Sequence, residues 1–152
     1  MIYRILLFLL INFAALALGG LFTSKAVSLD WYLQLNNAPW TPPGWVFGAA
    51  WFTIMVCFSV YMAYIYKTPV NTSMLIALFC IQWILNLMWN PVFFYFHAPM
   101  AGLLIISALT ILIGYMLFYY FPLGKAISLL LLPYFVWLLI ATSLNAFIVF
   151  KN

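Results

Sequence analysis

The sequence predicts an all-α membrane protein, a five-transmembrane-helix bundle in which residues 1–152 form a single domain. The composition is 70% hydrophobic and 4% charged, whereas a soluble domain carries about 25% charged residues. Mean hydropathy is +1.21. The apolar residues fall into five runs of about 20 residues, the length that crosses a bilayer as a helix. Five such runs nearly exhaust the chain, which leaves no room for a second domain.

Polar or proline-containing breaks define the ends of the spans. The first run ends at the polar triplet that begins with Thr23, and a loop then extends to Pro43. The later breaks contain Lys67, His97 and Pro122. We therefore expect spans at residues 2–22, 44–66, 73–96, 100–121 and 125–150.

Two prolines fall inside these spans, Pro91 in the third and Pro133 in the fifth. Each should kink its helix and free a backbone carbonyl, because proline lacks an N–H. The first span also has features of a signal peptide, with Arg4 before an apolar run that contains the triplet Ala15-Leu16-Ala17. Its apolar stretch is longer than a usual signal core, which favours a retained span.

The few charges indicate a weak orientation. Arg4, Lys67 and Lys125 fall on one side of the membrane, and Lys25 and Lys151 fall on the other. Three cations against two favour a cytoplasmic N-terminus under the positive-inside rule. Lysines at span ends also anchor helices by reaching the headgroups, so these charges indicate no nucleic-acid partner.

The residue inventory leaves little room for enzyme chemistry. Asp30 is the one acidic side chain and His97 the one histidine, so no carboxylate pair exists for acid–base catalysis. Cys57 and Cys80 lie in different spans, and with a single histidine they fall short of a metal site. We expect no metal, no cofactor and no catalytic residue, and we interpret the cysteines as small apolar core residues.

The segment from Trp40 to Trp51 is the most informative in the chain. A polar, proline-stiffened turn leads directly into an apolar helix that carries tryptophans at intervals. Proline is tolerated in the first helical turn, so we expect Thr41 as the N-cap and Pro42 at the first helical position. This arrangement would place rigid indoles at the mouth and inner face of a pocket for a large flat ligand. A stripe of Phe47, Trp51, Met55 and Phe58 continues along the helix.

Polar and aromatic side chains recur at helical spacing in the third and fifth spans. Gln82, Asn86 and Asn90 share one face of the third span. Polar groups in hydrocarbon need partners, so these faces should look inward. The asparagines either contact a ligand or join helices at about 0.6–2 kcal/mol each. Trp51 and Trp137 lie away from the headgroup belt, and we expect them to flank a cavity wide enough for a macrocycle.

Small residues recur at four-residue spacing in two spans. Ala15 and Gly19 form one such step in the first span, and Thr110 and Gly114 form another in the fourth. Such steps let helix backbones approach closely, either within the bundle or at a dimer face, and the sequence does not separate the two.

Together these motifs resemble the translocator protein family, also called the tryptophan-rich sensory protein or peripheral-type benzodiazepine receptor family (TspO/MBR). The resemblance rests on the W-x-P-P-G block at Trp40, on Gln82-x-x-x-Asn86-x-x-Trp89-Asn90, and on Pro133-Tyr134-x-x-Trp137-x-x-x-Ala141-Thr142-x-x-Asn145. It spans the whole chain. It implies a dimeric five-helix bundle in the lipid bilayer that binds protoporphyrin IX, related tetrapyrroles, sterols or benzodiazepine-site drugs and acts in their transport, sensing or regulation.

The resemblance also implies site residues. Tyr32 and Pro42 would belong to a lid over the pocket, and the remaining candidates would line it: Phe47, Trp51, Asn86, Trp89, Asn90, Trp137, Ala141 and Leu144. The alternative function is a light- or oxygen-dependent enzyme that degrades bound porphyrin. The fifth span lacks the tyrosine of the animal sterol motif, which argues against sterol binding by that route. The compact chain has no mitochondrial extension and fits a bacterial cell membrane.

Overall fold

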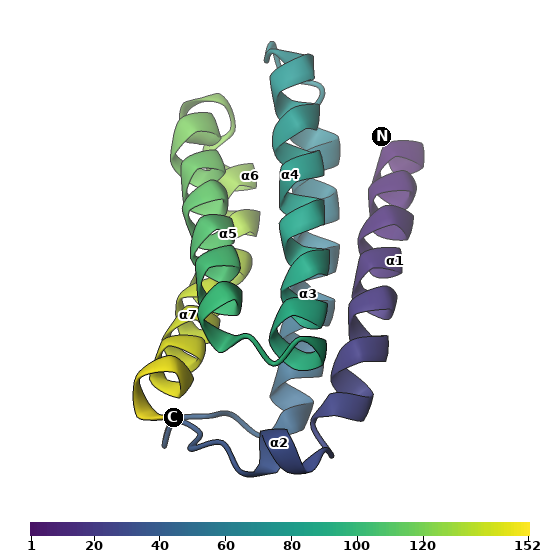
Figure 1. Cartoon of the computed structure of the whole chain (residues 1–152). Helices are drawn as coiled ribbons and strands as arrows, with labels where there is room; N and C mark the ends of the chain where they lie inside the picture. Colours follow the sequence, from purple (N-terminus) through teal and green to yellow (C-terminus); the bar gives the residue numbers. More distant parts are fainter.

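The computed structural model describes all residues from Met1 to Asn152 and contains helices and connecting loops. Five helical segments are long and apolar enough to cross a membrane, which confirms the predicted five-helix bundle. They run side by side, with the N-terminus at one end of the bundle and the C-terminus at the other (Figure 1). The spans are Ile2–Ala26, Gly44–Ile65, Thr72–Tyr95, Pro99–Leu123 and Lys125–Lys151.

The first two spans are joined by the long loop that covers one end of the bundle. Helix α1 (Ile2–Ala26) extends four residues beyond its predicted end. The Thr23 hydroxyl donates to Asn90 Oδ1 at 2.7 Å, with the Gly19 carbonyl 3.3 Å away, so this polar side chain is satisfied inside the helical bundle. The one-turn helix α2 (Asp30–Leu33) lies in the loop, beneath the bundle in Figure 1. Helix α3 (Gly44–Ile65) follows.

The predicted cap of α3 is wrong. Helix α3 begins at Gly44, with Pro43 as its N-cap at φ −56° and ψ 149°, and no side chain caps it. Thr41 and Pro42 each precede a proline, and a residue before proline is pushed toward extended backbone by the following ring. The helix therefore starts only after the second proline.

The two mid-span prolines act differently. Helix α4 (Thr72–Asn90) continues into a π-helical turn, η1 (Pro91–Tyr95), in which the Phe96 N–H donates to the Pro91 carbonyl at 3.0 Å. In the fifth span the regular α-helix is interrupted just before Pro133, which lies in the first turn of α7 (Leu132–Lys151). The segments before it are α6 (Lys125–Ser128) and the 3₁₀ turn η3 (Leu129–Leu131).

Helix α5 (Pro99–Tyr120) ends in the 3₁₀ turn η2 (Phe121–Leu123) and packs on both α4 and α7. The core between the helices is largely aromatic. The Phe58 ring packs at 5.5 Å from the Tyr134 ring and 5.9 Å from the Phe79 ring, and Phe58 and Tyr134 are fully buried. Lipid tails are as apolar as these side chains, so close packing and hydrogen bonds hold the bundle.

Hydrogen bonds between side chains join the spans in pairs. Asn12 donates to Ser59 at 2.9 Å and links α1 to α3, and Gln82 donates to the Tyr134 hydroxyl at 2.7 Å and links α4 to α7. Asn12 is almost fully buried, and it was not among the polar residues predicted to face the bundle interior. A polar side chain in hydrocarbon without a partner is costly, so these pairs fix which helix faces meet.

The small-residue steps are used inside the bundle. Gly19 is buried against the Asn90 amide, and a Cβ there would lie 2.7 Å from Asn90 Nδ2. Gly114 is likewise buried, and a Cβ there would lie 3.0 Å from the Phe135 ring. Both glycines therefore serve close packing between helices of one chain.

Candidate ligand-binding site

A void of about 60 Å³ lies between the covering loop and the bundle. It gathers side chains from α2, the loop, α3, α4, η1 and α7. Five of the predicted site residues line it, namely Tyr32, Phe47, Trp89, Ala141 and Leu144. The lining is completed by Thr41, Phe93, Phe94, Asn145 and Ile148.

The wall formed by α4 and η1 is aromatic and rigid. The Trp89 ring stacks on Phe93 at 5.3 Å and meets the edge of Phe94 at 5.7 Å. Its indole N–H donates to Asn145 Oδ1 at 3.2 Å, and the Asn145 amide donates to the Pro99 carbonyl at 3.0 Å. The indole is thereby fixed by a bond network that spans α4, α5 and α7.

The loop closes the void from the membrane surface. Tyr32 packs against Phe94 with ring centroids 5.7 Å apart, and burial raises the pKa of its phenol above the ordinary value of 10.0. The Tyr32 hydroxyl is therefore a neutral hydrogen-bond donor across the physiological range. Pro42 is half-buried in the same loop, next to Thr41 in the chain.

Ring contacts and hydrogen bonds hold this loop to the bundle. The Trp31 ring stacks on His97 at 4.2 Å and meets the edge of Phe93 at 5.9 Å. The Trp40 indole donates to the Ser143 hydroxyl at 3.2 Å.

The end of the loop is also bonded to the C-terminus. The backbone N–H of Asn36 donates to Asn152 Oδ1 at 2.8 Å, and the Asn36 side chain donates to the Lys151 carbonyl at 3.3 Å. The hydrogen bonds at Asn36 and Trp40 lie at exposed positions, so the loop is held to the bundle without a buried hydrogen bond between side chains.

The structure places the other predicted residues elsewhere. Trp51 meets Tyr134 edge to face at 5.9 Å, within the main core. The Asn90 side chain accepts a bond from the Thr23 hydroxyl at 2.7 Å and joins α4 to α1. Asn86 is buried one turn before the lining residue Trp89, and it does not line the void itself.

The expected wide cavity between Trp51 and Trp137 is wrong for this closed form. The Phe47 ring packs against Trp137 at 5.2 Å, and Tyr134 occupies the space beside Trp51. The void that remains has room for about two water molecules at ~30 Å³ each. Pockets for drug-sized ligands hold about 300–1,000 Å³, so a large ligand requires the loop to move.

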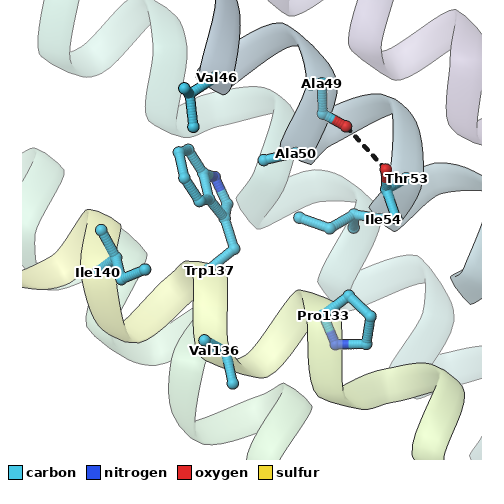
Figure 2. Close-up of a pocket in the computed structure, with 9 residues that line it drawn as sticks. All are labelled: Val46, Ala49, Ala50, Thr53, Ile54, Pro133, Val136, Trp137 and Ile140. Carbon is cyan, nitrogen blue, oxygen red and sulfur yellow. Dashed lines mark hydrogen bonds between the residues drawn. The ribbon is translucent and has the colours of Figure 1, made fainter. Parts of the chain in front are cut away.

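A second hollow, of about 340 Å³, lies between α3 and α7, and exposed residues of both helices line it (Figure 2). Most of its lining residues were not among the predicted site residues. Trp137 is the one predicted residue in its lining. The Thr53 hydroxyl donates to the Ala49 carbonyl at 2.9 Å, so its proton is already used within the helix. We call this hollow the α3–α7 groove. Its lining consists of Val46, Ala49, Ala50, Thr53, Ile54, Pro133, Val136, Trp137 and Ile140.

Sequence reasoning missed Phe93, Phe94 and Asn145 as lining residues. Phe93 and Phe94 follow Pro91, where the helix widens into the π turn, so ordinary helical spacing does not place them. Asn145 lies one residue after Leu144, and its spacing leaves open whether its amide joins helices or contacts a ligand. In the structure, Asn145 takes part in the hydrogen-bond network with Trp89 and also lines the void.

Comparisons with known proteins agree with this architecture. The model of the TspO/MBR family matches residues 7–150. The chain is 36% identical to the tryptophan-rich protein TspO of Archaeoglobus fulgidus, over 100% of this chain and 96% of the relative. It is 35% identical to the protein of the same name from Chlorobaculum tepidum, over 84% and 82% of the two chains. The human translocator protein is 28% identical over 77% of this chain and 72% of its own.

The family match covers nearly the whole chain, and the five spanning helices give it the architecture of a multi-pass integral membrane protein. The tryptophans and asparagines that carried the resemblance lie within the matched residues. The chain belongs to the TspO/MBR family.

Proposed function

We propose that this protein binds tetrapyrroles such as protoporphyrin IX, and other flat hydrophobic ligands, between the loop and the bundle. By this proposal it acts in their transport, sensing or regulation. The observation that carries the proposal is the aromatic void beneath the loop. Four ring-bearing side chains from the bundle line the void, and a fifth comes from α2: Phe47, Trp89, Phe93, Phe94 and Tyr32.

The chemistry of a porphyrin matches this lining. A porphyrin is a broad π-system with an apolar perimeter, and aromatic side chains contact such surfaces by stacking or by their edges. Each aromatic contact contributes about 0.5–1.5 kcal/mol beyond the area it buries. Trp89 is held in place before a ligand arrives, by its bond to Asn145, so little side-chain entropy is lost there on binding.

The size of the void sets a condition on binding. A macrocycle does not fit in about 60 Å³, so the loop that carries Tyr32 must swing outward. The hydrogen bonds that the loop makes at Asn36 and Trp40 are exposed, so this motion breaks no buried hydrogen bond there, although it must part the ring contacts of Trp31 and Trp40. Binding by this route is an induced fit in which the ligand replaces the loop side chains against the aromatic wall.

The direct test is a titration of the protein in lipid nanodiscs with protoporphyrin IX, in which quenching of tryptophan fluorescence is the measured signal. We expect saturable quenching in the wild type. Ala141→Phe should weaken binding at least ten-fold, because its ring would fill the void that Ala141 lines. The matched control is Ala77→Phe on the exposed side of α4, which should bind like the wild type.

A second variant guards against misfolding of the first. Leu144→Ala enlarges the same void and should bind at least as tightly as the wild type. If Ala141→Phe and Ala77→Phe bind protoporphyrin IX equally well, the ligand does not use this void. Illumination of the complex separates simple binding from the degradation alternative, because binding alone returns the pigment intact by mass spectrometry.

We also propose that the protein forms a homodimer, on the strength of the family resemblance. The glycines Gly19 and Gly114 are buried within one chain, so the dimer contact must use other, lipid-facing positions. Cross-linking in native membranes, with mass analysis of the product, tests this proposal. A product of a single chain's mass at every cross-linker concentration would contradict it.

A further inference from the structure

We propose that the end of the bundle opposite the loop binds the headgroup of an anionic phospholipid. The binding surface consists of three cationic side chains from three different parts of the chain, Arg4, Lys67 and Lys125, and we call it the basic end patch. It lies at the other end of the bundle from the void beneath the loop, and the inference does not depend on the proposed function.

The fold brings two of these cations together at the C-terminal end of α3. Arg4 lies in the first turn of α1, and its guanidinium lies over the Tyr66 ring, 4.7 Å from the ring centroid. Lys67 is the next residue after Tyr66 and is exposed. A guanidinium above an aromatic ring is attracted by its negative face. The Arg4 side chain is therefore held beside Lys67 before any anion arrives.

The third cation approaches the same place from the turn between α5 and α6. Lys125 is the first residue of α6 and is exposed. It follows Gly124, where a Cβ would lie 3.6 Å from Cδ1 of Ile65, the last residue of α3. In Figure 1 this turn and the N-terminus lie at the end of the bundle opposite α2. The end of α3 is thus the centre of the patch.

No group of the protein neutralises the patch. Asp30 is the one acidic side chain in the chain, and it follows α1 at the opposite end, roughly 35 Å away at 1.5 Å per residue. The last carbonyls of α3 would attract cations, but they already accept hydrogen bonds from the backbone beyond the helix and from the Thr68 hydroxyl. The three charges are therefore free for an anion from outside the protein.

The depth of the patch identifies that anion. Arg4 is the third residue of its span, Lys67 lies two residues beyond the span Gly44–Ile65, and Lys125 begins the fifth span. Side chains at span ends lie in the headgroup layer, where the lipid phosphates are. The fork of an arginine fits two phosphate oxygens, and lysines add point charges. A lipid with a net negative charge is favoured, because the choline of a zwitterionic headgroup is repelled by the same cations.

The experiment compares two lipids that differ only in headgroup charge. The protein in detergent micelles is titrated with phosphatidylglycerol or with phosphatidylcholine of the same acyl chains, and native mass spectrometry measures the lipid-bound fraction. We expect the first phosphatidylglycerol to bind about ten-fold more tightly or better than the first phosphatidylcholine. Each cation near an anionic lipid contributes about five-fold in affinity.

Paired variants of equal net charge locate the site. Lys67→Gln with Lys125→Gln should weaken phosphatidylglycerol binding about ten-fold or more and leave phosphatidylcholine unchanged. The matched control removes two cations at the loop end, Lys25→Gln with Lys151→Gln, and should bind phosphatidylglycerol like the wild type. All four lysines are exposed, so neither pair disturbs the core. Arg4→Lys keeps the charge and should bind more tightly than Arg4→Gln.

Three outcomes would overturn the proposal. Equal affinity for the two lipids would mean that the cations only anchor the helix ends. Equal losses in the two paired variants would mean that the lipid responds to net charge and not to this patch. Displacement of phosphatidylglycerol by an equal concentration of glycerol 3-phosphate would mean that the patch binds a soluble phosphate. None of these outcomes bears on the protoporphyrin titration, so failure here is distinguishable from failure of the proposed function.

Discussion

The Phe47 and Trp137 rings meet edge to face, with centroids 5.2 Å apart and planes at 85°. Phe47 lines the void beneath the loop, and Trp137 lines the α3–α7 groove. The ring pair is therefore the partition between an inner hollow closed by the loop and an outer hollow open to lipid.

Truncation of one ring tests this partition. Phe47→Ala should join the two hollows and raise the association rate of protoporphyrin IX several-fold, measured by stopped-flow quenching in nanodiscs. Phe47 is half-buried, so the loss in free energy of unfolding should be about 1–3 kcal/mol, less than for a fully buried phenylalanine. Phe52→Ala removes an exposed ring of the same helix and should leave the association rate unchanged. An unchanged rate in Phe47→Ala would show that ligands enter only past the loop.

The contact between α1 and α4 at Gly19 gives a second prediction. A Cβ at Gly19 would lie 2.7 Å from Asn90 Nδ2, so Gly19→Ala must displace an amide that holds the Thr23 hydroxyl at 2.7 Å. We expect a loss of about 1 kcal/mol in the free energy of unfolding. At Gly20 no atom lies within 4 Å of such a Cβ, so Gly20→Ala should gain up to about 0.5–1 kcal/mol. Unfolding in detergent micelles measures both, and equal stabilities would contradict the packing argument.

The fold was predictable because the membrane constrains it strongly. A bilayer requires apolar runs of about 20 residues, and all five were recognisable, with ends within a few residues of the observed ones. The error at the end of α1 arose because Thr23 is polar by type, yet its hydroxyl is satisfied inside the bundle by Asn90 Oδ1 at 2.7 Å. The error at Thr41 was avoidable, since a residue before proline disfavours helical backbone.

The site was predictable only in part. Tyr32, Phe47, Trp89, Ala141 and Leu144 do converge on one void. Trp51 shares a helical stripe with Phe47, but its ring packs against the buried Tyr134 and lines neither hollow, and sequence spacing carries no such information. The α3–α7 groove was not predicted either. A hollow depends on which small residues face each other across two helices, and one sequence does not specify that pairing.

The stack between Trp31 and His97 should act as a latch on the loop. The rings lie 4.2 Å apart at 20°, and His97 adopts the left-handed region with φ 52°. Asparagine tolerates that backbone, so His97→Asn removes the ring without adding strain. A lost aromatic pair of about 0.5–1 kcal/mol should speed protoporphyrin association about two- to five-fold. Phe96→Leu is the control, because the Phe96 ring pairs with Tyr95 instead. Equal rates in the two variants would contradict a latch.

Alkaline pH should open the loop through Tyr32. Burial raises the pKa of the Tyr32 phenol above 10.0, so the closed loop favours the neutral form. The stabilisation from this group is complete below the ordinary pKa of about 10 and is lost as the pH rises through the raised value. A spin label at Gln34→Cys, with Cys57 and Cys80 replaced by alanine, reports loop mobility.

Mobility of this label should increase as the pH rises above the ordinary phenol pKa of about 10 in the otherwise wild-type loop. Tyr32→Phe lacks the ionisable group and should show a smaller increase over the same range. The comparison between the two chains removes every effect of alkaline pH that does not act through Tyr32. Identical mobility curves would mean that the Tyr32 phenol ionises without leaving its contact with Phe94, and that the loop is held by its other links alone.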